Sequence, residues 1–214
     1  RLDDVVGTLD LSRDLAGQGF NLLLFDLRGR GDSEGKGRSL CNIEDDLGGA
    51  LDYAKSRGYE ARHIAMLGFC SGAASACLFG SREDVGALVL DGCFASINRM
   101  VEHQAAQRHI PVPLVRFFLP GVSLSVKLIY HYQLTNPEDV IGQVICPILF
   151  IYEEYDDLTP LEDVQGLLDA SPNTSNELWQ IDGALHSGGY KAEPQAYIQR
   201  VTEFLDAALG GSNQ

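Results

Sequence analysis

The sequence alternates between short apolar runs and amphipathic segments, and this alternation limits the folds open to the chain. Near-continuous apolar runs of strand length are expected where both faces of a sheet are covered. We predict strands at residues 20–27, 63–70, 85–91, 147–153 and 177–181. Helices are predicted at residues 4–16, 43–56, 71–79, 160–170 and 190–209. Strands alternating with helices indicate an α/β fold, with a mostly parallel, doubly wound sheet and helices on both faces.

Residues 94–142 interrupt this alternation, because their apolar residues follow neither period and four prolines fall among them. Prolines inside a helix remove hydrogen bonds, so we expect breaks there. The stretch predicts a helical, cap-like insertion within a single domain spanning residues 1–214, a length that suits one core. Its aromatic residues are expected to attach the cap to the domain or to line a substrate pocket: Phe117, Phe118, Tyr130 and Tyr132.

Composition narrows the possible partners. A formal net charge of -14 argues against a nucleic-acid-binding face, which would be basic. We see no apolar run near the roughly 20 residues that cross a bilayer, so no membrane segment is expected. The five cysteines form no CxxC pair, which argues against a zinc site or a disulfide framework and favours reduced thiols in the cytoplasm. No metal or organic cofactor is implied, and the sequence does not determine the oligomeric state.

The segment Gly-Phe-Cys-Ser-Gly at residues 68–72 ends a predicted strand and opens a predicted helix. A sharp turn in that position exposes its central side chain above the sheet. The side chain here is Cys70, and the start of a helix stabilises a negatively charged sulfur. The backbone N–H of the next residue, Ser71, is a candidate oxyanion donor.

A nucleophile of this kind needs a base, and the base needs a carboxylate that orients it. Asp156 lies shortly after the end of a predicted strand, and the adjacent Asp157 is an alternative candidate for the orienting carboxylate. His186 follows the last predicted strand on a glycine-rich loop. Since the carboxyl ends of parallel strands share one edge of the sheet, we expect these side chains to meet Cys70 there.

With these motifs in this order, the sequence resembles the α/β-hydrolase superfamily, in its branch of esterases and prolyl-oligopeptidase-like serine hydrolases. Asp26-Leu27-Arg28-Gly29-Arg30-Gly31-Asp32-Ser33 resembles that branch's D-x-R-G-x-G-x-S turn, whose residues are expected to stabilise the turn. The resemblance implies a Cys70–His186–Asp156 triad with the Ser71 N–H in the oxyanion hole. It also implies a hydrolase of small carboxylic esters or thioesters that forms an acyl-enzyme.

Two features depart from the family pattern. The nucleophile position normally holds serine, and a cysteine there resembles dienelactone hydrolases only in the G-x-C-x-G segment. Cys70 is therefore a natural thiol nucleophile, an altered residue that disables a serine enzyme, or a drifted position in a non-catalytic binding or scaffold protein. No His-Gly pair precedes the first predicted helix, so the second oxyanion donor is not identified and earlier strands are expected to lie outside this sequence.

Overall fold

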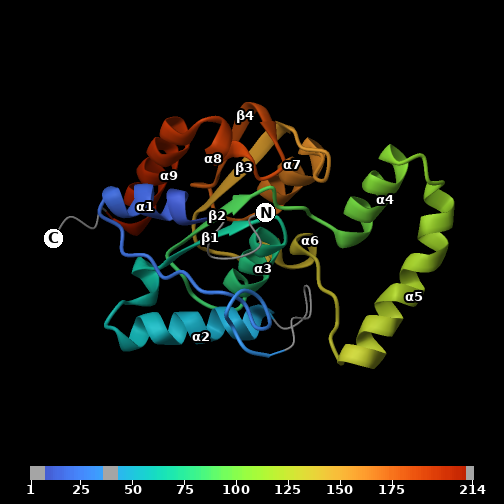
Figure 1. The fold of residues 1–214 in the computed structure, drawn as a ribbon, viewed down its shortest axis with the longest axis horizontal. Helices are drawn as coiled ribbons and strands as arrows, with labels where there is room; N and C mark the ends of the chain where they lie inside the picture. Colours follow the sequence, from blue (N-terminus) through green and yellow to red (C-terminus); the bar gives the residue numbers. More distant parts are fainter. Residues whose placement is uncertain (1–7, 36–42, 211–214) are drawn as a thin grey trace.

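A computed structural model describes residues 8–35 and 43–210 of the 214-residue chain (Figure 1). The strands are β1 (Ala65–Phe69), β2 (Ala87–Asp91), β3 (Ile148–Tyr155) and β4 (Glu177–Leu185). The longer helices are α1 (Leu9–Gly17), α2 (Ile43–Ser56), α3 (Ser71–Gly80), α4 (Ile97–Gln107), α5 (Val112–Tyr130), α7 (Leu161–Ala170) and α9 (Pro194–Leu209). The short helices are η2 (Ala61–His63), α6 (Pro137–Val140), η3 (Ile141–Gln143) and α8 (Gly189–Ala192).

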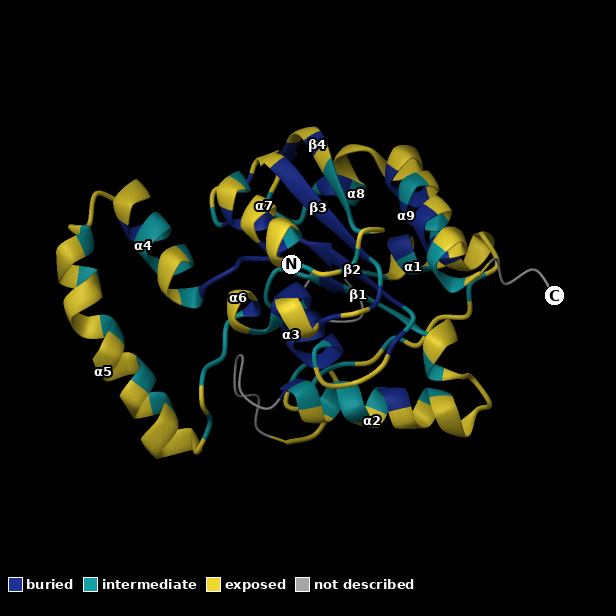
Figure 2. Cartoon of the chain, turned by 180° about the vertical axis from the view of Figure 1, so that it is seen from behind, coloured by how far each residue is buried: buried dark blue, intermediate teal, exposed yellow. Residues whose placement is uncertain are grey.

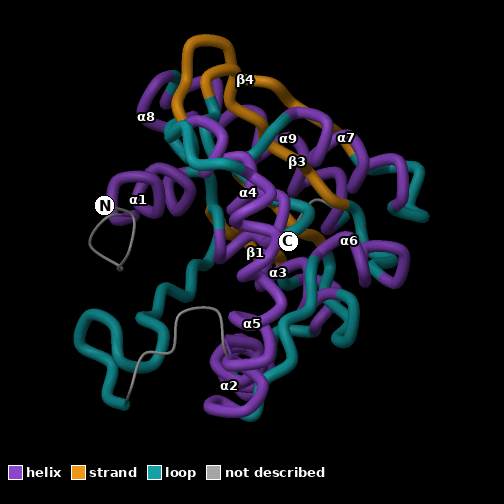
Figure 3. Tube along the Cα trace, turned by 90° about the vertical axis from the view of Figure 1, so that its right-hand side faces the viewer, coloured by secondary structure: helices purple, strands orange, loops and turns teal. Residues whose placement is uncertain are grey.

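The four strands form one parallel sheet in the order β1-β2-β3-β4. Successive side chains of a strand point to opposite faces, so each strand supplies two cores. Leu88 and Phe150 face a core that includes residues of α2, α3 and α7, whereas Val89 and Ile151 face a core that includes residues of α1 and α9. This two-sided burial explains the continuous apolar runs, and it confirms the predicted α/β fold, with a parallel sheet and helices on both faces (Figure 3).

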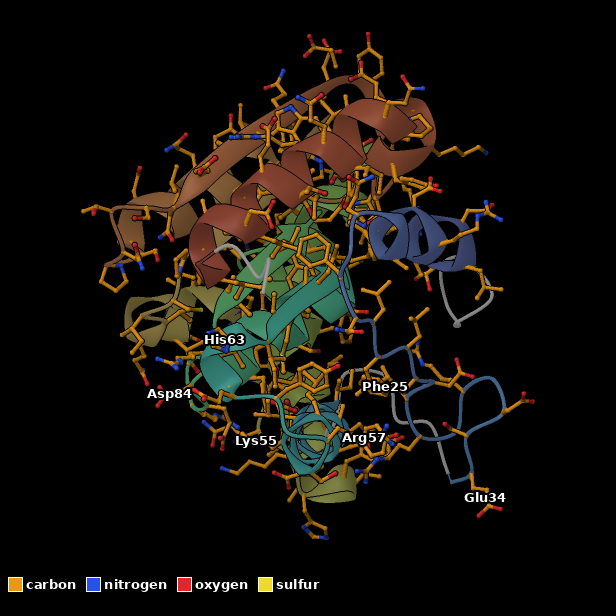
Figure 4. The ribbon with its side chains drawn as sticks, turned by 90° about the vertical axis from the view of Figure 1, so that its left-hand side faces the viewer. Phe25, Glu34, Lys55, Arg57, His63 and Asp84 are labelled. Carbon is orange, nitrogen blue, oxygen red and sulfur yellow. The ribbon has the colours of Figure 1, made fainter. Side chains whose placement is uncertain are left out.

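The strand predicted at residues 20–27 is wrong. The segment forms no strand and pairs with none among the described residues, and Leu22, Leu23 and Phe25 are exposed. Figure 4 shows Phe25 on a stretch of chain that runs outside the sheet. An apolar run becomes a strand only when its N–H and C=O groups find a neighbouring strand, and none of the described residues provides one.

The turn that follows this segment behaves as predicted. The Ser33 hydroxyl donates to the Asp26 carbonyl at 2.6 Å, and the Asp32 N–H donates to Asp26 Oδ2 at 3.2 Å. The Arg28 side chain binds Asp46 on α2, with Nε 2.6 Å from Oδ1. These contacts fold the turn on itself and attach it to α2.

The last predicted helix, at residues 190–209, divides into α8 and α9. Glu193 separates them with φ -135° and ψ 70°. The residue before a proline is sterically disfavoured in the helical region, so Pro194 ends one helix and begins the next. Tyr197, Val201 and Phe204 on α9 then fill the core as expected.

The insertion at residues 94–142 is helical, but its longest helix was not expected. α5 runs for 19 residues through Pro120, and Pro113 lies in its first turn, where proline is tolerated. By length and composition alone α5 is apolar enough to cross a membrane, a run that we did not identify from the sequence, but these two properties do not by themselves make it a membrane segment. Phe117 and Phe118 are exposed, so they neither attach the cap nor line a pocket. The Tyr132 hydroxyl, in contrast, donates to Glu44 on α2 and attaches the end of the cap to the domain.

Candidate active site

Cys70 occupies a strained backbone position between β1 and α3. Its φ is 51° and its ψ is -115°, values that a residue with a side chain rarely adopts. Two hydrogen bonds hold it there: its N–H donates to the Asp91 carbonyl at 2.9 Å, and its carbonyl accepts from the Ala74 N–H at 3.1 Å. The first bond joins the turn to β2 and the second begins α3, leaving the half-buried Cys70 side chain at the strand–helix junction.

The two glycines around this turn are not equivalent. A Cβ added to Gly68 would lie 2.5 Å from the Gly72 carbonyl oxygen and 2.7 Å from the Ala73 nitrogen, so a larger residue does not fit. A Cβ on Gly72 would meet nothing within 4 Å. The backbone therefore packs closely against Gly68, whereas the side-chain position of Gly72 is open.

Asp156 and His186 form the second part of the site. Nδ1 of His186 lies 2.7 Å from Oδ2 of Asp156, whose side chain is fully buried. The other carboxylate oxygen, Oδ1, accepts the N–H groups of Leu158 at 2.7 Å and Thr159 at 2.9 Å. These bonds fix the Asp156 carboxylate, whereas its sequence rival Asp157 is exposed.

The charge state of His186 depends on both neighbours. Burial by itself lowers the pKa of its imidazole, but hydrogen bonding to Asp156 and Cys70 and the charges of both groups raise it to about 10. With Nδ1 on Asp156, the buried Nε2 has no partner of ordinary hydrogen-bond geometry among the described residues. The imidazole is therefore oriented at one nitrogen and, at the other, available to exchange a proton with the neighbouring Cys70 side chain.

Gly92 was not foreseen from the sequence and holds the His186 ring in place. It follows β2 with φ +62°, and an added Cβ would lie 2.8 Å from Cε1 and 3.1 Å from Nδ1 of His186. The imidazole therefore rests against the bare backbone of this residue. The signal that could have identified it is a glycine directly after a buried strand that ends at the same edge as Cys70.

Two buried carboxyl groups lie behind the site and were also missed. Asp91 ends β2, Glu153 lies in β3, and both are completely buried. The Tyr197 hydroxyl donates to Asp91 Oδ2 at 2.7 Å. Burial raises the pKa of Asp91 to about 6, and burial together with the charge of Asp91 raises the pKa of Glu153 to about 9. Carboxyl groups inside apolar strand sequences were the available signal.

The backbone N–H of Ser71 is placed as an oxyanion donor. Ser71 is the first residue of α3, where a helix has no internal acceptor for its N–H. That N–H is available to an oxyanion beside Cys70.

A hollow lined by Ser75, Phe94 and Tyr132 lies further along α3 and is not lined by Cys70. Within residues 8–35 and 43–210, no three His, Cys, Asp or Glu side chains are placed to hold a metal ion.

Comparisons with known proteins agree with this architecture. Residues 4–141 match the family described as serine aminopeptidase, S33. The uncharacterized protein YqkD of Bacillus subtilis is 27% identical over 197 residues, and the chain spans 63% of its length. The Pyrococcus furiosus esterase Pf2001 shares 24% identity with a TM-score of 0.74, over 94% of this chain and 74% of the esterase. The α/β-hydrolase GrgF from Penicillium is 20% identical with a TM-score of 0.69, over 97% of this chain and 86% of its own.

Proposed function

Because the chain belongs to the serine aminopeptidase S33 family of α/β-hydrolases, we propose that it hydrolyses carboxylic esters or thioesters through an acyl-enzyme on Cys70. The observation that supports this most directly is the arrangement around His186. The buried Asp156 holds its imidazole at Nδ1, and the other nitrogen, Nε2, has no hydrogen bond of ordinary geometry and can exchange a proton with the neighbouring Cys70 side chain. A nucleophile, a base and a carboxylate that orients the base are the parts needed for acyl transfer.

Acylation needs Cys70 as the thiolate and the proton on Nε2 of His186, which takes it from the thiol directly or already holds it in a standing ion pair. The sulfur attacks the substrate carbonyl carbon, a carbon–sulfur bond forms, and the carbonyl π electrons move to oxygen. The Ser71 N–H stabilises this oxyanion. The oxyanion then collapses, the bond to the leaving alcohol or thiol breaks, and the imidazolium returns its proton to that leaving group. Asp156 keeps the imidazolium oriented and stabilises its charge.

Deacylation repeats these steps with water. His186 removes a proton from water as the oxygen attacks the acyl carbon of the thioester on Cys70. When the new tetrahedral intermediate collapses, the carbon–sulfur bond breaks and His186 returns the proton to sulfur. The carboxylic acid leaves and the free thiol is restored. We place this reaction in the cytoplasm, because Cys70, Cys77, Cys93 and Cys146, the cysteines within the described residues, are all free thiols.

The proposal is tested with p-nitrophenyl acetate, a soluble activated ester. We expect turnover, and a mass increase of one acetyl group on the protein when the reaction is stopped early. Cys70→Ala should abolish both, while Cys146→Ala, which removes a buried thiol elsewhere, should keep both. An amino-acid p-nitroanilide tests amide hydrolysis, which the description of the family includes, in the same assay. Turnover of the ester that survives in Cys70→Ala would reject the proposed nucleophile.

The cysteine in a serine position supports a second candidate, a non-catalytic α/β-hydrolase that binds a partner. This candidate predicts neither turnover nor acetylation, and no preference of iodoacetamide for Cys70. Cys70→Ser separates a third case, since a gain of ester hydrolysis would identify the parent as a disabled serine hydrolase. The three cases thus give different results with one substrate and two substitutions.

A further inference from the structure

Helix α5 exposes an apolar side that no other part of the described chain covers. None of its 19 residues is buried. The exposed fraction is 77% for Phe117, 65% for Leu128 and 67% for Ile129. The other large apolar residues exposed along it are Leu114, Phe118, Val122, Leu124 and Tyr130. Contiguous apolar patches of this kind on a monomer mark sites of interaction with a protein or a membrane.

Most of the surface of the helix is exposed, and only one side of it is half-buried. Positions 114, 117, 118, 121, 124, 125 and 128 recur at three- and four-residue spacing, and all of them are exposed. The half-buried positions 112, 115, 119, 123 and 126 recur in the same way on the opposite side. α5 packs on α4, and the two helices stand apart from the sheet along one side of the molecule (Figures 1 and 2). The outer side of α5 is thus accessible to a large flat surface.

The stretch of chain that contains α5 has no acidic residue, unlike the remainder of the chain. The net charge is -14, yet all 30 Asp and Glu residues lie outside residues 103–137. That stretch holds Arg108, Arg116 and Lys127. A negatively charged surface would repel most of the molecule, but it would accept this face. A second copy of the chain is a poorer match, because a two-fold contact between these faces brings cations together, and Glu102 on α4 is already bound to Arg116.

The ends of α5 argue against a helix that crosses the membrane. Near its start, Arg116 binds Glu102 on α4 with two hydrogen bonds, of 2.9 Å and 2.8 Å. Just beyond its end, the Tyr132 hydroxyl donates to Glu44 on α2 at 2.9 Å. A helix of this length spans roughly 28 Å, so a crossing would put the two ends on opposite sides of a bilayer. Both ends are attached to the same protein body, so α5 can lie only along the surface.

We propose that α5 is the site at which this protein binds an anionic lipid surface. Its outer apolar side enters the boundary between headgroups and acyl chains, while Arg108 and Lys127 lie at the level of the lipid phosphates. One apolar helix with few cations gives reversible binding that depends on lipid charge. The inference does not depend on ester hydrolysis.

Vesicle flotation tests this inference. Vesicles of mixed phosphatidylcholine and phosphatidylglycerol should carry the protein upward at low salt. Vesicles of phosphatidylcholine alone should carry less, and high salt should release the protein. Replacing Phe117 and Leu128 together by Asp should reduce the floated fraction at least about tenfold, because two charges must then enter the apolar boundary. Replacing Tyr53 and Ile145 by Asp is the matched control, since both are exposed apolar residues outside α5 and should leave flotation unchanged.

Each contrary result has a defined meaning. No flotation at low salt, or equal flotation of the Phe117→Asp/Leu128→Asp variant, would overturn the site. Equal binding to uncharged vesicles would overturn the anionic surface. A dimer in light scattering that dissociates only in this double variant would show that a second copy covers α5 instead. Hydrolysis of soluble p-nitrophenyl acetate by the variants is measured separately, so loss of lipid binding and failure of the proposed reaction are distinguishable.

Discussion

The carboxyl group of Glu153 interacts with that of Asp91 in the interior, behind the loop that carries His186. Both groups are acceptors when ionised, and as carboxylates neither oxygen of Glu153 nor Oδ1 of Asp91 has a donor among the described residues. A proton on one carboxyl group resolves this, since the protonated group can donate to the other. The raised pKa of Glu153, about 9, assigns the proton to Glu153 at neutral pH.

This buried proton should make the free energy of unfolding depend on pH. The ordinary pKa of the Glu153 carboxyl is 4.5, so between pH 4.5 and about 9 the folded chain holds a proton that the unfolded chain releases. Stability should therefore fall as pH rises through that window, by at most about 1.4 kcal/mol per pH unit. Glu153→Gln keeps a donor for Asp91 and cannot ionise, so the free energy of unfolding of this variant should fall less than that of the parent as pH rises. Urea unfolding from pH 5 to 9 measures the difference.

The matched control for that experiment is Glu162→Gln, which removes an exposed carboxylate at the start of α7. Its pH profile should follow that of the parent. The raised pKa of His186 also lowers stability as pH rises toward about 10, but it is common to all three proteins and cancels in the comparison. Parallel profiles for Glu153→Gln and the parent would show that Glu153 is ionised in the folded chain.

Asp156 and Asp157 offer a direct comparison of a buried carboxylate with an exposed one. Asp156→Asn should lower the kcat of ester hydrolysis by roughly 10²- to 10⁴-fold, because the amide no longer stabilises the imidazolium or fixes its tautomer. It should also lower the pKa of His186, which NMR titration of the ring protons detects. Asp157→Asn should change neither quantity, since that side chain lies in solvent. Equal losses in both variants would assign the effect to the loop as a whole.

Several elements could be predicted from the sequence because their signals are local. Helix α2 begins and ends where its apolar period and acidic first turn indicate. Cys70, Asp156 and His186 each directly follow a strand, and parallel strands end at one edge, so strand order alone predicts their meeting. The turn that contains Asp26 could equally be predicted from the sequence, because a serine and two glycines at fixed spacing close it.

What the sequence could not show depends on non-local pairing. Residues 20–27 have the period of a buried strand, but period does not reveal whether a neighbouring strand is present. The meeting of Asp91 and Glu153 depends on register. Asp91 pairs with Ile151, which puts Glu153 two residues further on the same face. Local signals also failed to predict that α5 continues through Pro120. Its apolar side chains are exposed over most of its surface, so the helix lacks the one-sided burial from which a helix is usually predicted.

The thiols should differ strongly in their reaction with iodoacetamide. Cys77, Cys93 and Cys146 are buried, and burial raises the pKa of each thiol, whereas Cys70 is half-buried beside His186. We expect site-resolved mass spectrometry of the native protein to find Cys70 alkylated at least about tenfold faster than these three, because the thiolate is the reacting species. His186→Ala should slow Cys70 without affecting the buried thiols. Equal rates at all four positions would indicate alkylation through an opened chain.

Gly92 should be intolerant of any side chain. Gly92→Ala adds a Cβ in a left-handed backbone conformation, which costs about 1–2 kcal/mol, and that Cβ would lie 2.8 Å from the His186 ring. The ring must then move, and a displacement near 1 Å at a reacting group lowers kcat about 10²-fold. Gly166→Ala on α7 is the control, because its Cβ would meet nothing within 4 Å. It should keep kcat and slightly raise the urea midpoint. If Gly92→Ala loses stability but keeps the parent kcat, the contact with His186 does not position the imidazole for catalysis.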